Sequence, residues 1–88
     1  MKVLGIGVDA TEISRFRLVL SKKKDRFIAN TFSEAEQKYC LSYRDHAPHF
    51  AGIFAAKEAA LKAQGDFSLP LKALEIRHDT KGKPAVWI

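Results

Sequence analysis

The segment PHFAGIFAAKEAALKAQG, residues 48–65, gives the strongest helix signal in the chain. Proline suits the first turn of a helix, where its missing N–H would have no partner, and glycine suits the residue that follows the last turn. The residues between Pro48 and Gly65 are mostly alanines and large apolar side chains, which allow close packing against other elements. The segment therefore predicts the central helix of a small core.

Further elements precede this segment. Continuous apolar and glycine residues predict a buried strand over residues 2–8, and apolar residues at helical spacing predict a helix over about 11–22, then a short one to Asn30. Ser33 and Glu36 form an S-x-x-E capping box, in which each side chain bonds the backbone N–H of the other residue. A helix is therefore expected from this box to about Arg44.

The residues after Gly65 predict a hairpin. Residues 73–79 alternate between apolar and polar, 80–83 have turn composition, and 84–88 form a second apolar run. The order strand, helices, hairpin predicts an α+β fold with helices packed on a small, mainly antiparallel sheet. With 88 residues and no linker or repeat, residues 1–88 are expected to form a single domain.

The composition restricts the function. Apolar residues make up 47% of the chain and charged residues 28%, as in a globular protein without a membrane span, and no signal peptide is visible, so we expect a cytoplasmic protein. The net charge of +5 favours an acidic partner. Three lysines in residues 22–24 resemble a nucleic-acid patch, but without aromatic or base-reading residues they are better interpreted as a solvated helix end. A basic nucleic-acid-binding module is the most remote alternative.

Cys40 is the only cysteine. A single cysteine excludes an internal disulfide and a cysteine-clustered zinc site. Because Cys40 lies inside a predicted helix, we expect a small buried apolar residue and no catalytic thiol.

Residues 5–10, GIGVDA, fit the G-x-G-x-x-A form of the dinucleotide-binding fingerprint. Asp9 argues against this interpretation, because its carboxylate opposes the positive field that would hold a pyrophosphate. The expected succession of helices also lacks the alternating strands of a dinucleotide domain. Dinucleotide binding stays a minor alternative.

Glu58 and Lys62 are four residues apart and share one face of the predicted central helix. The simplest interpretation is an i,i+4 ion pair, which contributes about 0.3–0.5 kcal/mol. A second interpretation starts from the apolar character of this helix, which should place it against the first strand, so that Glu58 meets Asp9 at the strand end. Two carboxylates together with phosphates and water would form a Mg²⁺ site. Spacing alone leaves both interpretations open.

Four segments together resemble a known family. GIGVDATEISRF (5–16), FSEAEQKYC (32–40), FAGIFAAKEAALKAQG (50–65) and LEIRHDTKGKPAV (74–86) resemble, in order and spacing, the phosphopantetheinyl transferases of the holo-acyl-carrier-protein synthase type. The resemblance implies a 4′-phosphopantetheinyl transferase-like fold. It also implies transfer of the 4′-phosphopantetheine group from coenzyme A to a serine of an acyl carrier protein, with release of adenosine 3′,5′-bisphosphate.

The resemblance also implies roles for individual residues. Mg²⁺ would be bound by Asp9 and Glu58, and the catalytic residues would be Glu58 and Lys62, with Lys62 beside the leaving phosphate. The general base stays open between a water and a carboxylate. Further coenzyme A contacts are expected from Arg44, Lys57 and Gly65. The acidic carrier protein is expected to dock on a basic surface that contains Arg15, Lys22, Lys23, Lys24 and Arg26.

The chain differs from the family pattern at a few places. Ile53 stands where the family usually has arginine, and the family's last helix and strand would follow Ile88, so the domain is expected to lack them. A non-catalytic relative that binds coenzyme A or a carrier protein is the alternative function. Trp87 and Ile88 would leave an apolar patch on a monomer, so we expect a homo-oligomer. The resemblance implies a trimer, and a dimer is the second choice because two-fold pairs are the commonest assembly.

Overall fold

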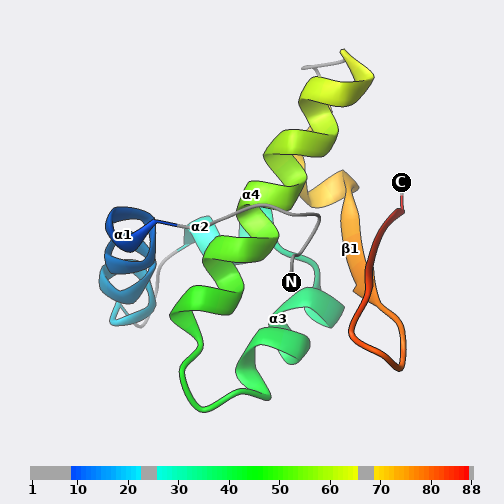
Figure 1. Ribbon diagram of the computed structural model, residues 1–88. Helices are drawn as coiled ribbons and strands as arrows, with labels where there is room; N and C mark the ends of the chain where they lie inside the picture. Colours follow the sequence, from blue (N-terminus) through cyan, green and yellow to red (C-terminus); the bar gives the residue numbers. More distant parts are fainter. Residues whose placement is uncertain (1–8, 23–25, 66–68, 88) are drawn as a thin grey trace.

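The computed structural model describes residues 9–22, 26–65 and 69–87 (Figure 1). The predicted strand over residues 2–8 lies outside the described residues, as do Lys23 and Lys24. The elements, in chain order, are the helices α1 (Ala10–Leu20), α2 (Arg26–Thr31), α3 (Glu34–Leu41) and α4 (Ala47–Gln64), the 3₁₀ helix η2 (Leu71–Ala73), and the strands β1 (Glu75–His78) and β2 (Pro84–Trp87).

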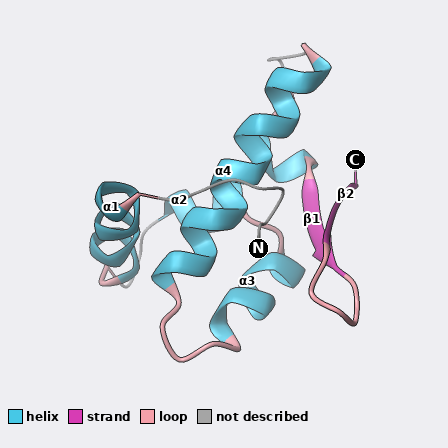
Figure 2. Ribbon diagram, viewed as in Figure 1, coloured by secondary structure: helices cyan, strands magenta, loops and turns pink. Residues whose placement is uncertain are grey.

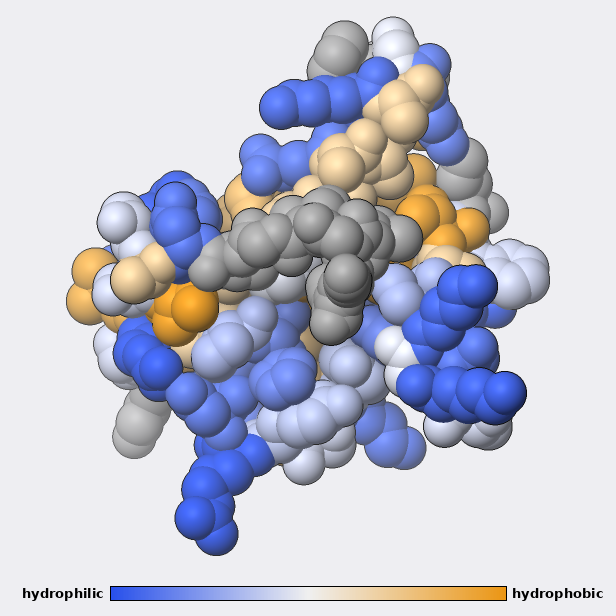
Figure 3. Space-filling view, viewed as in Figure 1, coloured by the Kyte–Doolittle hydropathy of each residue, from blue (hydrophilic) through white to orange (hydrophobic). Residues whose placement is uncertain are grey.

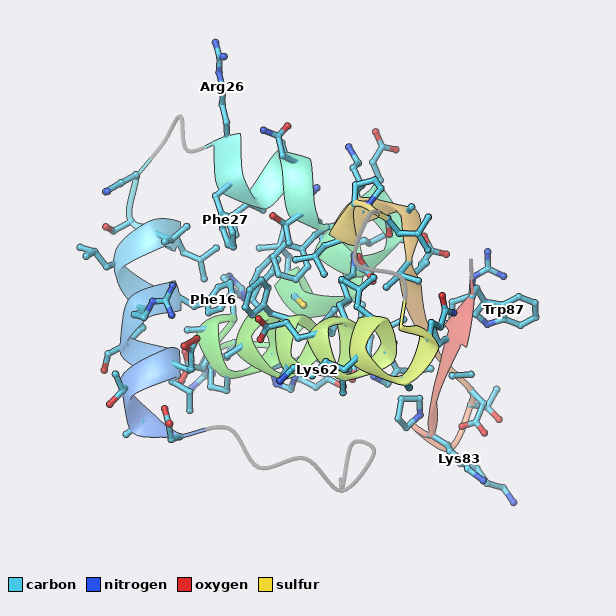
Figure 4. The ribbon with its side chains drawn as sticks, turned by 90° about the horizontal axis from the view of Figure 1, so that it is seen from above. Phe16, Arg26, Phe27, Lys62, Lys83 and Trp87 are labelled. Atoms are coloured by element: carbon cyan, nitrogen blue, oxygen red, sulfur yellow. The ribbon has the colours of Figure 1, made fainter. Side chains whose placement is uncertain are left out.

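Helix α4 crosses the middle of the molecule. Figures 1 and 2 show α1 on one side of α4 and the β1–β2 hairpin on the other, and the view from above in Figure 4 agrees. The helix runs from Ala47 to Gln64, with Pro48 in its first turn. Gly65 ends it with a left-handed φ of 72°, and the Gly65 N–H bonds the carbonyls of Leu61 and Lys62. The predicted central helix and its glycine cap are confirmed.

Helix α1 begins with a side-chain cap. Asp9 has extended backbone angles, and its Oδ1 accepts a hydrogen bond of 2.8 Å from the N–H of Glu12. This bond satisfies one of the N–H groups that the first helical turn leaves without a partner. Asp9 is therefore the N-cap of a helix that starts at Ala10.

Helix α3 confirms the predicted capping box. The Ser33 N–H donates to Glu36 Oε1 at 2.8 Å, and the Glu36 N–H donates to the Ser33 hydroxyl at 3.1 Å. The helix ends at Leu41, before the predicted end at Arg44. The Ser42 hydroxyl donates to the Tyr39 carbonyl at 2.6 Å in the last turn, where serine competes with the helical hydrogen-bond pattern.

The hairpin is also confirmed. Strands β1 and β2 pair antiparallel, with Glu75 opposite Trp87 and His78 opposite Pro84. The Asp79 carboxylate accepts hydrogen bonds of 2.8 Å from two backbone N–H groups of the turn, and Gly82 provides the positive φ of 82° that the turn requires. These two strands are the sheet that the described residues form, so the fold is α+β as predicted. Four α-helices precede the hairpin in this part of the chain, and this order disfavours the dinucleotide alternative.

The core lies where α1, α3, α4 and β1 meet. It also includes Phe32, the residue that follows α2. Phe32 packs edge-on against Phe50 of α4, with ring centroids 5.0 Å apart, and Phe16 of α1 contacts Phe32 at 6.0 Å. Cys40 is fully buried, and burial raises the pKa of its thiol to about 12, with the charge of Glu36 as a smaller cause. The prediction of a buried, unreactive cysteine is thereby supported. None of the helices in the described ranges has the length and apolar character to cross a membrane.

A second, aromatic cluster joins α3, α4 and β1. His78 of β1 stacks on Tyr39 of α3 with a centroid distance of 4.0 Å, and His49 of α4 stacks on Tyr43 at 3.6 Å. The two tyrosine hydroxyls are hydrogen-bonded at 3.2 Å. Burial lowers the pKa of both histidines, so both favour the neutral imidazole.

Candidate active site

The helix capped by Asp9 packs against the helix that contains Glu58 and Lys62. Among the helix pairs described, α1 and α4 have the most extensive contact. Phe16 of α1 contacts Phe54 of α4, with ring centroids 5.6 Å apart. The fold therefore brings the elements of the predicted site together; convergence of Asp9 and Glu58 on one ion stays a prediction.

Asp9 retains capacity to bind a ligand. Its side chain is exposed, and its described hydrogen bond uses Oδ1, so Oδ2 accepts none from the described residues. The cap and a metal contact are compatible, because one oxygen suffices for each.

Glu58 and Lys62 lie on the exposed side of α4. In Figure 4, Lys62 extends along the side of α4 opposite to α2. Within the described ranges, neither side chain forms an ion pair or a hydrogen bond, including with each other. The i,i+4 ion pair is therefore not formed, and both groups are available to a ligand.

The donor set suits a hard cation that shares its ligands with a substrate. The part of the chain that the structure describes contains no group of three or more His, Cys, Asp or Glu residues that could hold a metal. Asp9 and Glu58 are exposed carboxylates, which Mg²⁺ prefers, and Mg²⁺ usually completes its shell with water and phosphate oxygens. The two residues fit Mg²⁺ bound together with a phosphorylated ligand.

The structure corrects the role that was predicted for Lys57. Its side chain is 0% exposed, and its Nζ lies 2.6 Å from Glu36 Oε1. It also donates to the carbonyls of Thr31 at 2.7 Å and Leu71 at 3.0 Å. Burial lowers the pKa of Lys57, and the hydrogen bond and charge of Glu36 oppose that shift. The prediction of a coenzyme A contact at Lys57 is wrong, because this ammonium group does not reach the surface.

Arg44 and Gly65 are exposed at opposite ends of α4. Next to Arg44, the carboxylate of Asp45 forms a two-pronged ion pair with Arg17 of α1, with N–O distances of 2.7 and 2.9 Å. This pair ties the loop between α3 and α4 to α1; its hydrogen bond lowers the pKa of Asp45. The ligand contacts of Arg44 and Gly65 stay predictions.

The predicted docking surface is exposed where it is described. Arg15 pairs with Glu12 at 2.6 Å but keeps 67% of its side chain exposed. Lys22 and Arg26 are exposed, and Arg26 extends away from the molecule in Figure 4. Leu18 of α1 is 63% exposed, and Figure 3 shows apolar residues among hydrophilic ones on the side of α1. Charged and apolar contacts are both available to a partner there.

Sequence reasoning missed two roles. The Glu36 carboxylate caps α3, pairs with Lys57 and accepts the Ile76 N–H at 2.7 Å, and only the cap was expected. The N-cap role of Asp9 was also missed, although the D-x-x-E spacing of Asp9 and Glu12 was a signal for a helix start.

The chain is similar to proteins of one known family. The family model described as "4'-phosphopantetheinyl transferase superfamily" matches residues 5–87. The holo-[acyl-carrier-protein] synthase of Protochlamydia amoebophila is 47% identical over 97% of this chain and 72% of its own length. That of Chlamydia pneumoniae is 49% identical over 74% of this chain, and the match spans about half, 53%, of that protein.

A solved structure shows the same fold. The apo-ACPS structure from Chronobacterium ammoiniagenes superposes with a TM-score of 0.70 at 28% identity, and the match covers 93% of this chain and 68% of that one. The sequence and fold comparisons cover nearly the whole chain and agree with each other. The chain therefore belongs to the 4′-phosphopantetheinyl transferase superfamily and is of its holo-[acyl-carrier-protein] synthase type.

Proposed function

We propose that this chain transfers the 4′-phosphopantetheine group from coenzyme A to a serine of an acyl carrier protein and releases adenosine 3′,5′-bisphosphate. The proposal rests on the family match over residues 5–87. It is supported by the exposed, unpaired Glu58 and Lys62 on α4 beside the helix that Asp9 caps. Several relatives of similar sequence are named holo-[acyl-carrier-protein] synthase.

Asp9 and Glu58 would hold Mg²⁺ together with the coenzyme A pyrophosphate. When bound, the ion would supply Lewis-acid polarisation of the phosphoryl group and offset the negative charge on the leaving phosphate. Lys62, four residues along the same face of α4, would place a positive charge beside that phosphate. Arg44, exposed at the other end of the helix, is a further phosphate contact.

The proposed reaction is a phosphoryl transfer in which one phosphorus–oxygen bond forms and one breaks. The serine oxygen of the carrier protein forms a bond to the β-phosphorus of coenzyme A, and the bond from that phosphorus to the bridging oxygen breaks. A carboxylate or a water molecule takes the serine proton, and adenosine 3′,5′-bisphosphate leaves with the bridging oxygen. The contribution of this chain is to position the phosphates and compensate their charge, as in other phosphoryl transfers.

The acidic carrier protein would dock on the exposed basic residues of α1 and the segment that follows it. Charges on such a surface accelerate association more than they change the chemistry. Leu18, which lies between Arg15 and Lys22 along the chain, would add an apolar contact to this surface. The reaction would take place in the cytoplasm.

We also propose a homotrimer, with a dimer as the second choice. Trp87 is 52% and Val86 38% exposed on β2, and exposed apolar residues at a strand often mark an interface. Arg77 lies over the Trp87 ring with its Cζ 4.6 Å from the centroid. Sedimentation at micromolar concentration is expected to give three times the mass of the chain; a stable monomer would contradict the proposal.

Incubation of the protein with coenzyme A, Mg²⁺ and apo carrier protein tests the function. The carrier is expected to gain the mass of one phosphopantetheine group, and a carrier with its serine changed to alanine should gain none. Glu58→Gln should remove the mass gain without unfolding the chain, because this side chain is exposed.

One observation favours the alternative of a non-catalytic relative. Ile53, which replaces the arginine usual in the family, is 4% exposed and belongs to the core, so it offers no charge to a ligand. Coenzyme A binding by calorimetry without any mass gain on the carrier would favour this alternative.

A further inference from the structure

Lys57 and Glu58 are neighbours in α4 with opposite surroundings. Lys57 is 0% exposed, whereas Glu58 is exposed and has no described side-chain partner. We propose, on the basis of the proposed function, that the buried ion pair of Glu36 and Lys57 fixes the rotation of α4 about its axis and thereby positions Glu58 and Lys62. Lys57 and Glu36 are then positioning residues that never touch the substrate.

The ammonium group of Lys57 is held from three directions. A lysine ammonium has three N–H donors, and the structure provides three acceptors: Glu36 Oε1 at 2.6 Å, the Thr31 carbonyl at 2.7 Å and the Leu71 carbonyl at 3.0 Å. The acceptors come from α3, α2 and η2. The tip of this side chain is therefore fixed relative to three elements outside α4.

Glu36 is itself fixed. The N–H of Ser33 donates to Oε1 at 2.8 Å, and the N–H of Ile76 in β1 donates to Oε2 at 2.7 Å. Both side chains of the pair are completely buried. A buried pair of this kind adds little net stability, but separation of the charges is costly. The pair therefore opposes rotation of α4 more than it stabilises the fold.

The geometry of a helix transmits this constraint to the site. Consecutive residues are turned by about 100°, so Glu58 lies about 100° and Lys62 about 140° around the axis from Lys57. Phe50 and Ile53 bury the first half of α4, and Lys57 is the last buried residue of the helix, so it is the buried anchor nearest to Glu58 and Lys62. Because a displacement of about 1 Å at a reacting group can reduce the rate by about 100-fold, a fixed rotation matters for Glu58 and Lys62.

The experiment compares Lys57→Met with Phe50→Leu in the full chain. Phe50 is a buried residue of the same helix that packs on Phe32, so its substitution lowers stability and removes none of the hydrogen bonds of the pair. Mn²⁺ replaces Mg²⁺ as a spectroscopic substitute at an oxygen site, and its dissociation constant is measured by electron paramagnetic resonance in the presence of coenzyme A.

For Lys57→Met, we expect the Mn²⁺ dissociation constant to rise about tenfold and kcat to fall about 100-fold, while the KM for the carrier changes less than about twofold. For Phe50→Leu, we expect a lower melting temperature with the Mn²⁺ constant and kcat of the wild type. Should Lys57→Met fail to fold, the double variant Glu36→Gln/Lys57→Met leaves no buried charge unpaired and gives the same comparison.

A Lys57 variant with the wild-type Mn²⁺ constant and wild-type kcat overturns the proposal. A wild-type protein that binds no Mn²⁺ with coenzyme A also overturns it, because no site would then exist to be positioned. The proposed function fails separately if the wild type binds Mn²⁺ and coenzyme A but does not modify the carrier. In that case, the Mn²⁺ dissociation constants of the wild type and Lys57→Met still decide whether Lys57 positions the site.

Discussion

Replacement of Asp9 separates its two roles, the helix cap and the metal contact. In Asp9→Ala, the N–H of Glu12 loses its 2.8 Å acceptor, and loss of an N-cap typically costs about 1 kcal/mol. Removal of a negative charge from the N-terminal end of α1 adds about 0.3 kcal/mol at an exposed position. In a domain of this size, a total of about 1.3 kcal/mol lowers the melting temperature by about 5–10 °C.

Asp9→Asn is the matched variant. Asparagine caps a helix about as well as aspartate does, so stability should change by only a few tenths of a kcal/mol. The amide oxygen is neutral and a weaker ligand for Mg²⁺ than a carboxylate. We therefore expect both variants to lose carrier modification, and only the alanine variant to lose stability.

Two assays check this prediction: thermal unfolding followed by circular dichroism, and carrier modification followed by mass spectrometry well below both melting temperatures. A wild-type rate of modification by Asp9→Asn would refute the metal role. An Asp9→Ala variant with the wild-type melting temperature would refute the capping role.

Three further predictions concern other residues. Lys62→Ala should reduce the rate of carrier modification by about 100-fold, as expected for a lost contact to developing charge, with the melting temperature unchanged; the exposed Lys72→Ala is the control, and equal rates in both variants would contradict the role. His49 and His78 have folded-state pKa values below the unfolded value of about 6.5, so their contribution to stability is complete above that pH and is lost as the pH falls. The urea midpoint should thus decrease from pH 7.5 to 5.5, and a double histidine-to-glutamine variant that keeps the full decrease would argue against this cause. Cys40 is buried and the pKa of its thiol is raised to about 12, so it should react with a thiol reagent at pH 8 only after unfolding. Rapid labelling of the native protein would contradict the burial of this thiol.

The elements that could be predicted from the sequence have their partners close along the chain. The capping box of Ser33 and Glu36, the cap at Gly65 and the turn at Gly82 each involve residues at most four positions apart. Local composition decides such features before any tertiary contact forms.

The environment of Lys57 could not be predicted in the same way. Its carbonyl partners, Thr31 and Leu71, are 26 and 14 residues away. Spacing showed that Glu58 and Lys62 share a face, but an alanine-rich helix does not reveal whether that face or the face of Lys57 is turned inward. Packing by α2, α3 and η2 decides this question.

The bond between Glu36 and the Ile76 N–H has a consequence for folding and aggregation. A two-stranded hairpin alone is only marginally stable in water, but release of this hairpin would remove the Ile76 N–H from a buried carboxylate that also caps α3 and pairs with Lys57. Glu36 therefore couples the hairpin to α3, so the loss of the hairpin also weakens the environment of the α3 cap. A partly unfolded form with loose strands, whose free edges would recruit other chains into intermolecular sheets, is correspondingly scarce. The hydrogen bond between Glu36 and Ile76 thus lowers the population of a form with a released hairpin.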